Sequence, residues 1–581
     1  MLIKCLTNYC YIEMEFNYLV ERMDRKVIFI ILFISVYLIR LLFLDSDVRC
    51  FNLAQIQPLD ELYYNEIGIR IYNEGWNVLF TGKLDNVSIA NSKIFLIPNL
   101  FSALSFSIFG NNLIGLRFMY VLMGLITGLL LLKCSNRLFV DNPVIIIFIA
   151  VAFLFDFNLL MLSRSAVTVV PCMMVTLIYL YIMLFYKSGK MKYALLGGFP
   201  IACFFLVYGN MPFMIVLSFV YLLCCVTDKK KDWSKVGAFC IGILLSLLLC
   251  EIVDYAIFRR HFWNIFLDTI YAHHGKITQG NDMSIFALCR HAIHYFMSNM
   301  FRYNMLFTLL FICTIASSIL QCFRNRDRIS LIMLLFISFH WMQTIFLDNM
   351  TPAKATITYP IILLFIAYHL KNFEKEKMLL MSKSKYFYWI VSVFCLAMTV
   401  FVNEKYSKAL FPVDRVIIYV IAMITIALLY LRLYHNYKSI FYLVFLNVLM
   451  MSFLQMRYIY LNKSYGDVEM MKNIGALLGK KPVINGKGLC LYNTIHSVVD
   501  DYDQCKGFGY NEKWVLMKKK DEIEKNDSIY YIAYSSENIN DMIESIGYSD
   551  VTIELKKKYK RRYTSSFLEY DSDISVYCIK K

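Results

Sequence analysis

The chain has 581 residues, 59% of them hydrophobic, and a mean hydropathy of +0.54. This apolar share exceeds the roughly 45–50% of ordinary soluble domains, so the composition excludes a purely soluble protein and predicts a mainly α, polytopic membrane protein. A net charge of +16 would favour nucleic-acid binding in a soluble protein, but in a membrane protein Lys and Arg gather in loops on one side, so we expect no nucleic-acid partner. The 17 cysteines show no CxxC pair or zinc spacing and predict no disulfide framework.

The first apolar run covers residues 27–44 and follows a polar cytoplasmic segment, residues 1–26. The run can cross a bilayer with slight thinning and lacks a small-residue cleavage site, so it predicts an uncleaved anchor. Arg40 lies near its far end, where we expect it to snorkel or to pair with an acid. Met23 is an alternative start to Met1, because MDRK leads directly into the run.

A polar interval rich in acidic residues follows at residues 45–93. Asp60 and Glu61 open a helical pattern, with one face expected to hold Tyr63, Ile67, Ile71 and Tyr72. An acidic pair at a membrane surface suits proton-transfer chemistry. The alternative is that Asp60 only caps the helix, since Asp is a preferred N-cap residue.

The rest of the chain up to residue 460 is mainly apolar. Residues 94–109, interrupted by Pro98 and Asn99, predict a helix at the outer interface. Twelve further spans are expected at about 113–132, 143–162, 165–186, 193–208, 211–226, 236–257, 303–323, 328–347, 354–370, 386–402, 414–434 and 440–460. With the anchor, about 13 spans form a transmembrane domain at 27–460, with outer loops at 45–112 and 258–302.

Loop charges test this arrangement. The loops placed inside are rich in Lys and Arg, as at Lys229–Lys231, whereas the short loops placed outside are poorer, with Arg164 alone in one tight turn. This positive-inside bias predicts a cytoplasmic N-terminus and an extracytoplasmic C-terminus.

Basic residues and histidines gather in the long outer loop at 258–302. This cluster fits a phosphate-binding surface or, equally, a solvated face beside lipid headgroups. His273 and His274 could hold a divalent cation with a carboxylate from elsewhere, although two adjacent histidines are a weak metal signal. The sequence implies no other cofactor.

Residues 461–581 are different in kind and are long enough for one small domain. An amphipathic helix is expected at 467–479 and another helix near 537–546, with strands at about 488–494, 528–535, 551–558 and 574–579. We expect a small extracytoplasmic α/β domain. It has no nucleotide-binding glycine motif, which favours a recognition or structural role.

The order of parts resembles the GT-C glycosyltransferases, especially the lipid A aminoarabinose transferases and the protein O-mannosyltransferase superfamily. The segments that carry the resemblance are PLDELYYNEIG at 58–68, SALSFSIFGNNLIGLRFMYVLMGLITGLLLL at 102–132, MLSRSAVTVVPCMMVTLIYLY at 161–181, the span start with Gly197 and Gly198, and TPAKATITYPIILLFIA at 351–367. The chain departs from the family where Ser92-Lys93-Ile94 stands in place of a frequent Lys-Pro-Pro, and where Val169, Val170 and Pro171 follow the Ser-Arg turn instead of an acidic residue.

The resemblance implies transfer of a sugar from a polyprenyl-phosphate donor to a hydroxyl of a lipid, glycan or protein acceptor on the outer face of the plasma membrane. It implies Asp60 as the catalytic base, with Glu61 orienting it or contacting the acceptor. The candidate donor-phosphate partners are Lys93, Arg164, His273, His274 and Lys354. For Arg164 the alternative is a single cation in a tight turn, paired with Asp156, and for Lys354 a snorkelling residue at a span end.

Two other functions fit the composition. A transporter or flippase of lipid-linked saccharides would be expected to show internal repeats, and none is found between the halves of the chain. A polymerase or ligase of lipid-linked glycans would depend on a late outer loop rich in Arg and His, which 258–302 partly provides.

Overall fold

The structure is a computed structural model. It describes residues 25–46, 61, 65–81, 96–140, 142–186, 191–199, 233–264, 311, 314–315, 328–346, 356–373, 460, 473–474, 476–478, 483–485, 507–508, 527–534, 538–540, 551–559 and 573–580. Five of the seven predicted site residues lie outside this set: Asp60, Lys93, His273, His274 and Lys354. The spans expected at 211–226, 386–402 and 414–434 also lie outside it, as does almost all of 440–460.

The expected anchor is helical. It consists of α2 (Arg25–Leu38) and the 3-10 helix η1 (Ile39–Leu41). The chain turns sharply just after η1, where Phe43 has a φ of 54°, a left-handed conformation that is rare for a bulky residue. The polar interval that carries the acidic pair therefore begins at a tightly fixed turn.

A layer of short helices follows the anchor: α5 (Glu66–Glu74), the 3-10 helix η2 (Trp76–Phe80) and α6 (Leu96–Phe109). The helix expected at 94–109 is thus present as α6. Ile67 and Ile71 of α5 are buried as expected, but Tyr72 is 41% exposed, so that part of the predicted face is wrong. Ile69 is buried as well, against a different cluster, because α5 is covered on two sides.

The next helices form the centre of the helical part: α7 (Leu113–Leu138), α8 (Pro143–Phe155), α9 (Phe157–Ser163) and α10 (Val169–Tyr186). Asn112 begins α7 by accepting a hydrogen bond from the Gly115 N–H at 2.9 Å. The span expected at 143–162 is divided at Asp156, because the Asp156 carboxylate accepts the Leu159 N–H and starts a new helix.

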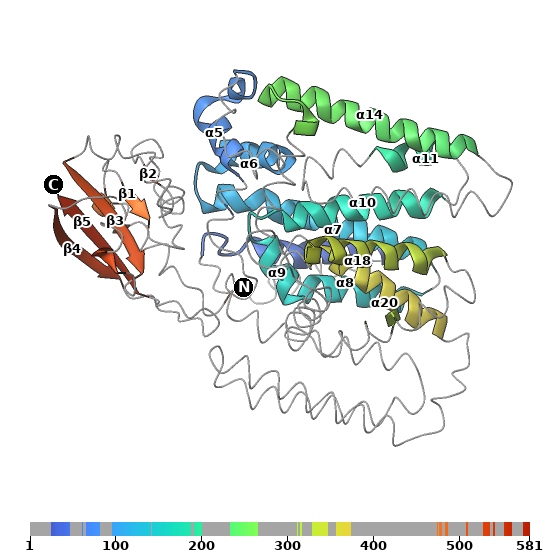
Figure 1. The fold of residues 1–581 in the computed structure, drawn as a ribbon. Coiled ribbons are helices and arrows are strands. Elements are labelled where there is room, and N and C mark those ends of the chain that lie inside the picture. The colour runs from blue at the N-terminus through green and yellow to red at the C-terminus, as the bar shows by residue number, and fades with distance from the viewer. Residues whose placement is uncertain are drawn as a thin grey trace, which may run out of the picture.

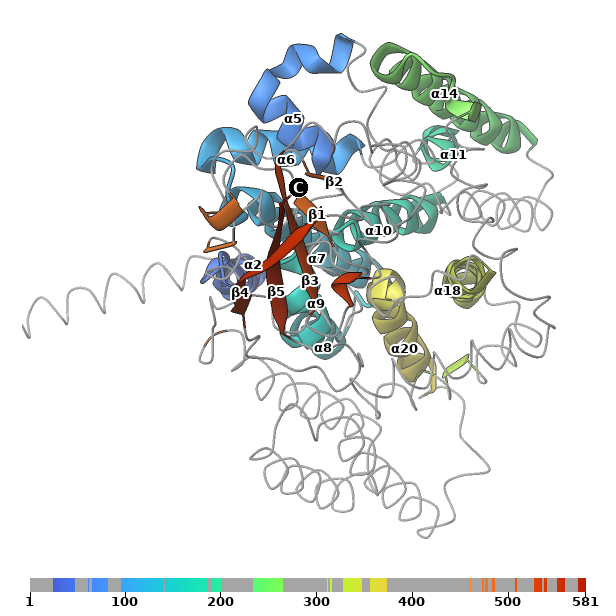
Figure 2. The same cartoon turned by 60° about the vertical axis from the view of Figure 1, so that its left-hand side comes forward.

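A second group contains α11 (Met191–Gly198) and α14 (Trp233–Phe258), and a third contains α18 (Arg328–Phe346), the 3-10 helix η5 (Thr356–Thr358) and α20 (Tyr359–Phe373). In both views α11 and α14 lie on one side of α7 and α10, and α8 and α20 lie on the other (Figures 1 and 2). Within the described residues, α7 and α14 are the two helices long and apolar enough to span a membrane by length and composition.

The contact between α11 and α14 is very close. A Cβ at Gly242 would lie 2.1 Å from the Leu195 carbonyl oxygen, and one at Gly198 would lie 2.3 Å from the Phe239 carbonyl oxygen. Backbones approach this closely only where side chains are absent, as is common between membrane helices. The glycines at this position therefore set the distance between the two helices.

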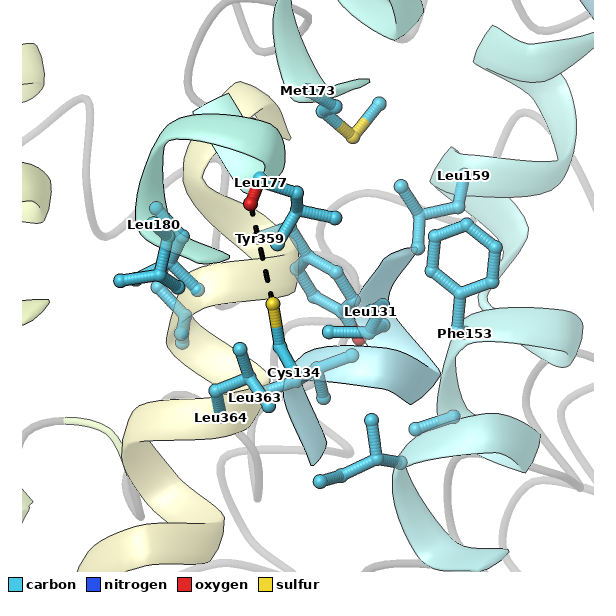
Figure 3. Close-up of a cluster of buried hydrophobic side chains, with 14 of the residues drawn as sticks. Leu131, Cys134, Phe153, Leu159, Met173, Leu177, Leu180, Tyr359, Leu363 and Leu364 are labelled. Atoms are coloured by element: carbon cyan, nitrogen blue, oxygen red, sulfur yellow. Dashed lines mark hydrogen bonds between the residues drawn. The ribbon is translucent and has the colours of Figure 1, made fainter. Parts of the chain in front are cut away.

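The apolar core joins α7, α8, α9, α10 and α20. Figure 3 shows these helices meeting around Cys134, whose sulfur lies 4.0 Å from the Leu177 carbonyl oxygen; the labelled neighbours are Leu131, Phe153, Leu159, Met173, Leu180, Tyr359, Leu363 and Leu364. The cysteine serves as a small apolar side chain among larger ones, which agrees with the use of cysteine inferred from the sequence.

The C-terminal part contains a five-stranded sheet in the order β2-β1-β3-β5-β4 (Figure 1). The strands are β1 (Val483–Asn485), β2 (Gly507–Phe508), β3 (Ser528–Tyr534), β4 (Thr552–Tyr559) and β5 (Ile574–Lys580). β1 is parallel to β2 and β3, and β5 is antiparallel to β3 and β4. Three strands coincide with expected ones, β1 and β2 were not predicted, and the strand expected at 488–494 lies outside the described residues.

Candidate functional site

Arg164 fixes the turn at which the first helix ends. It follows α9, and its Nη1 donates to the carbonyl oxygens of Arg40 at 2.6 Å and Leu42 at 2.7 Å, while Nη2 donates to Phe43 O at 2.8 Å. The last carbonyls of a helix lack partners within the helix, and a buried arginine can satisfy several of them together. Burial lowers the pKa of Arg164 to about 10, which leaves the guanidinium charged at neutral pH.

Arg117 of α7 binds the next carbonyl oxygens of the same turn. Its Nη1 donates to the carbonyl oxygens of Leu44 at 2.8 Å and Ser46 at 2.9 Å. The other side of the guanidinium holds Glu61, with Nε 3.0 Å from Oε1 and Nη2 2.9 Å from Oε2. This is a two-point ion pair, and both side chains are almost fully buried.

The Glu61 carboxylate is also bound by the turn after α9. Its Oε1 accepts the Ala166 N–H at 2.7 Å. Glu61 is 2% exposed, and its carboxylate accepts three hydrogen bonds, all from groups within the protein.

Asn65 lies beside this ion pair, just before α5, and is fully buried. Its Nδ2 donates to the carbonyl oxygens of Glu61 and of Ala166, the latter at 2.9 Å. Its Oδ1 accepts from the Tyr120 hydroxyl at 2.8 Å and from the Ser102 hydroxyl. The carbonyl oxygens can only accept, so they fix the amide with its NH₂ toward Glu61 and Ala166.

Arg40 occupies the break between α8 and α9, and the expectation that it snorkels or pairs with an acid is wrong. Its Nη2 donates to the carbonyl oxygens of Phe153 at 3.0 Å and Leu154 at 2.8 Å. Its Nη1 donates to Ser163 Oγ at 2.7 Å and to Leu159 O at 3.2 Å. Phe153 and Leu154 belong to the last turn of α8, whose carbonyls have no partner further along the helix, so Arg40 stabilises the break itself.

The structure brings two predicted site residues, Glu61 and Arg164, to the same turn after α9. Sequence reasoning missed Arg117 and Asn65. Arg117 had a usable signal, because it is an ionisable residue near the start of an apolar span. Asn65 had none, since a single Asn before a helix is usually interpreted as a cap.

Comparison with known proteins gives one family match. The family described as dolichyl-phosphate-mannose-protein mannosyltransferase matches residues 96–253, which run from α6 to α14. No curated protein matches the sequence.

Two solved structures of ArnT from Cupriavidus metallidurans share the fold. The form bound to undecaprenyl phosphate is 13% identical, with a TM-score of 0.61 over 95% of this chain and 98% of that chain. The apo form is 12% identical, with a TM-score of 0.53 over 96% of this chain and 98% of that chain. The family match and the shared fold confirm the resemblance to GT-C glycosyltransferases inferred from the sequence, and with it a multi-pass membrane protein.

Proposed function

We propose that this protein transfers a hexose or pentose from a polyprenyl-phosphate donor to a hydroxyl group on the outer face of the plasma membrane. The observation that carries the proposal is the buried Glu61–Arg117 ion pair, which fixes the residue next to Asp60 in a chain with the ArnT fold. The ArnT structure with undecaprenyl phosphate supports a polyprenyl phosphate as the lipid partner. The family match supports a lipid-linked sugar as the donor.

The proposed reaction is a single inverting displacement. The acceptor oxygen forms a bond to the anomeric carbon, the bond from that carbon to the phosphate oxygen breaks, and the acceptor proton passes to the Asp60 carboxylate. The leaving polyprenyl phosphate keeps the electron pair of the broken bond and needs nearby cations.

Glu61 is proposed to orient Asp60 and not to accept a proton. Its carboxylate already receives a two-point bond from Arg117 and a backbone N–H, and the residue is 2% exposed, so an acceptor hydroxyl has little access to it. Asp60 is joined to it by one peptide bond, so its Cα lies about 3.8 Å from that of Glu61. The contacts of Glu61 therefore limit where the Asp60 carboxylate can reach.

The proposed phosphate partners are Lys93, Arg164, His273, His274 and Lys354. Arg164 already gives both Nη atoms to carbonyl oxygens and has its Cζ 5.5 Å from the centre of the Tyr460 ring. The main phosphate contact is therefore assigned to Lys93, with the other residues assisting. The domain at 461–581 is proposed to face outside and to serve acceptor recognition or folding.

The test uses purified protein with a panel of undecaprenyl-phosphate-linked hexoses and pentoses carrying a labelled sugar, and extracts of the cell envelope as acceptors. Asp60→Asn removes the base but keeps the size and the capping ability of the side chain. Loss of a positioned general base typically lowers the rate about 10²–10⁴-fold. We expect Asp60→Asn to fold, to bind the donor and to transfer almost none of it.

Near-normal transfer by folded Asp60→Asn would make Asp60 a cap and would reject it as the base. Failure of the wild-type protein to consume any member of the panel would return the transporter or flippase function to first place.

A further inference from the structure

The side chain of Asn65 does not do what its position predicts. An Asn directly before a helix is expected to cap it by accepting an N–H from the first turn. Asn65 precedes α5 but makes no side-chain cap bond. Its amide is used by four groups that belong to other parts of the chain: Glu61, the turn at Ala166, α6 through Ser102 and α7 through Tyr120.

The two bonds from Nδ2 are the informative ones. One goes to the backbone of Glu61, next to the proposed base, and the other to the backbone of Ala166. Ala166 also uses its N–H, which donates to the Glu61 carboxylate. Asn65 and Arg117 thus hold the backbone and the side chain of Glu61, respectively.

We infer that Asn65 is a positioning residue for sugar transfer, which acts by fixing the backbone that carries Asp60 against the turn after α9. This inference rests on the proposed function. A displacement of about 1 Å at a reacting group can cost about 10²-fold in rate. Loss of the Asn65 amide removes its hydrogen bond to the Glu61 carbonyl, while the Glu61 carboxylate stays on Arg117, so the backbone that carries Asp60 and Glu61 can shift without loss of the ion pair.

The experiment compares Asn65→Ala with Asn99→Ala. Asn99 is also a fully buried asparagine of this layer, and its Oδ1 accepts the Gly68 N–H at 2.8 Å, so it ties α6 to α5. The assay measures kcat and KM with the undecaprenyl-phosphate sugar that the wild-type protein consumes, together with the melting temperature of each variant in detergent.

We expect both variants to melt at a lower temperature. Only Asn65→Ala is expected to lower kcat, by about tenfold or more, with the donor KM within about twofold of the wild-type value. Because Asn65 acts through Asp60, the double variant Asp60→Asn/Asn65→Ala is expected to be no slower than Asp60→Asn alone.

Different results reject different claims. If Asp60→Asn is inactive while Asn65→Ala keeps its kcat, the positioning role is wrong and the proposed base stands. If Asp60→Asn is active, the base and the positioning role both fall. If the double variant is clearly slower than Asp60→Asn, Asn65 acts independently of Asp60 and the inference is wrong.

A second set of variants applies if Asn65→Ala does not fold. Tyr120→Phe and Ser102→Ala each remove one hydroxyl donor to Oδ1 and leave the amide in place. We expect each variant to lower kcat less than Asn65→Ala would, with an unchanged donor KM. The fall of kcat should be largest in the variant that combines both substitutions. An unchanged kcat in the combined variant would overturn the inference.

Discussion

Replacement of Arg117 by methionine is expected to destabilise the protein more than loss of an ordinary ion pair would. Methionine keeps much of the aliphatic length but leaves the Glu61 carboxylate buried with the Ala166 N–H as its remaining partner, and leaves Leu44 O and Ser46 O without their donor. Removal of one partner of a buried ion pair typically costs about 3–5 kcal/mol, because an uncompensated charge stays in the interior.

The double variant Glu61→Gln/Arg117→Met tests this reasoning. Glutamine is neutral, so the combined change leaves no unpaired charge, and it should be less destabilising than the sum of the two single changes. We expect a coupling of about 1–3 kcal/mol between the two positions. The measurement is the unfolding free energy, or the order of melting temperatures, of the four proteins in one detergent.

A matched control is available on the neighbouring helix. Glu66 and Arg70 of α5 form a partly exposed i,i+4 ion pair at 3.0 Å, with side chains 23% and 26% exposed, and i,i+4 pairs on a helix are worth about 0.3–0.5 kcal/mol. Glu66→Gln should therefore change stability little. Additive effects of the two single changes at Glu61 and Arg117, or a cost of Arg117→Met as small as that of Glu66→Gln, would refute the account of the site.

Two further predictions concern the membrane part. In a cysteine-free background, an impermeant thiol reagent added to intact cells should label a cysteine at position 520 and not one at position 230; the reverse pattern would reject the proposed orientation. Gly242→Ala should destabilise the α11–α14 pair by about 1–3 kcal/mol, because its Cβ would overlap a backbone carbonyl. Gly237→Ala on the same helix, which meets nothing within 4 Å, should be neutral or slightly stabilising by thermal unfolding, and equal effects at the two positions would contradict the close packing.

Much of the helical part could be predicted from hydropathy alone. The expected span at 236–257 is α14, and the one at 328–347 is α18, each within three residues at either end. The length of an apolar run determines where such a helix begins and ends, and that length can be read from the local sequence. The same signal merged α8 and α9 into one span, because a single Asp156 in an apolar run barely changes the mean hydropathy.

The contacts of the site could not be predicted in this way. Glu61 meets Arg117 across 56 residues, and Asn65 meets Ala166 across 101. Periodicity shows which face of a helix is apolar, but it does not show which distant turn a polar side chain on that helix reaches. The resemblance at residues 58–68 located the acidic pair, whereas the partners of Glu61 followed only from the tertiary structure.

The arginines of the site explain why the chain ends its first helix where it does. Arg164 and Arg117 together donate hydrogen bonds to five carbonyl oxygens between residues 40 and 46. Near lipid, a helix end without such donors would leave polar groups unpaired at a cost of several kcal/mol each. A lysine, with one compact ammonium group, could not place donors on both sides of the turn and on a carboxylate as a planar guanidinium does.

The carbonyl contacts at this turn therefore fix the start of the polar interval, where Leu44 and Ser46 are buried. Of the two arginines that bind these carbonyls, Arg117 has its charge compensated by the Glu61 carboxylate. The end of the first helix and the position of Glu61 are thus held by one set of contacts. A change that loosens the turn at Phe43 should therefore also weaken the contact between Arg117 and Glu61, because Arg117 binds the carbonyls of Leu44 and Ser46 as well as the Glu61 carboxylate.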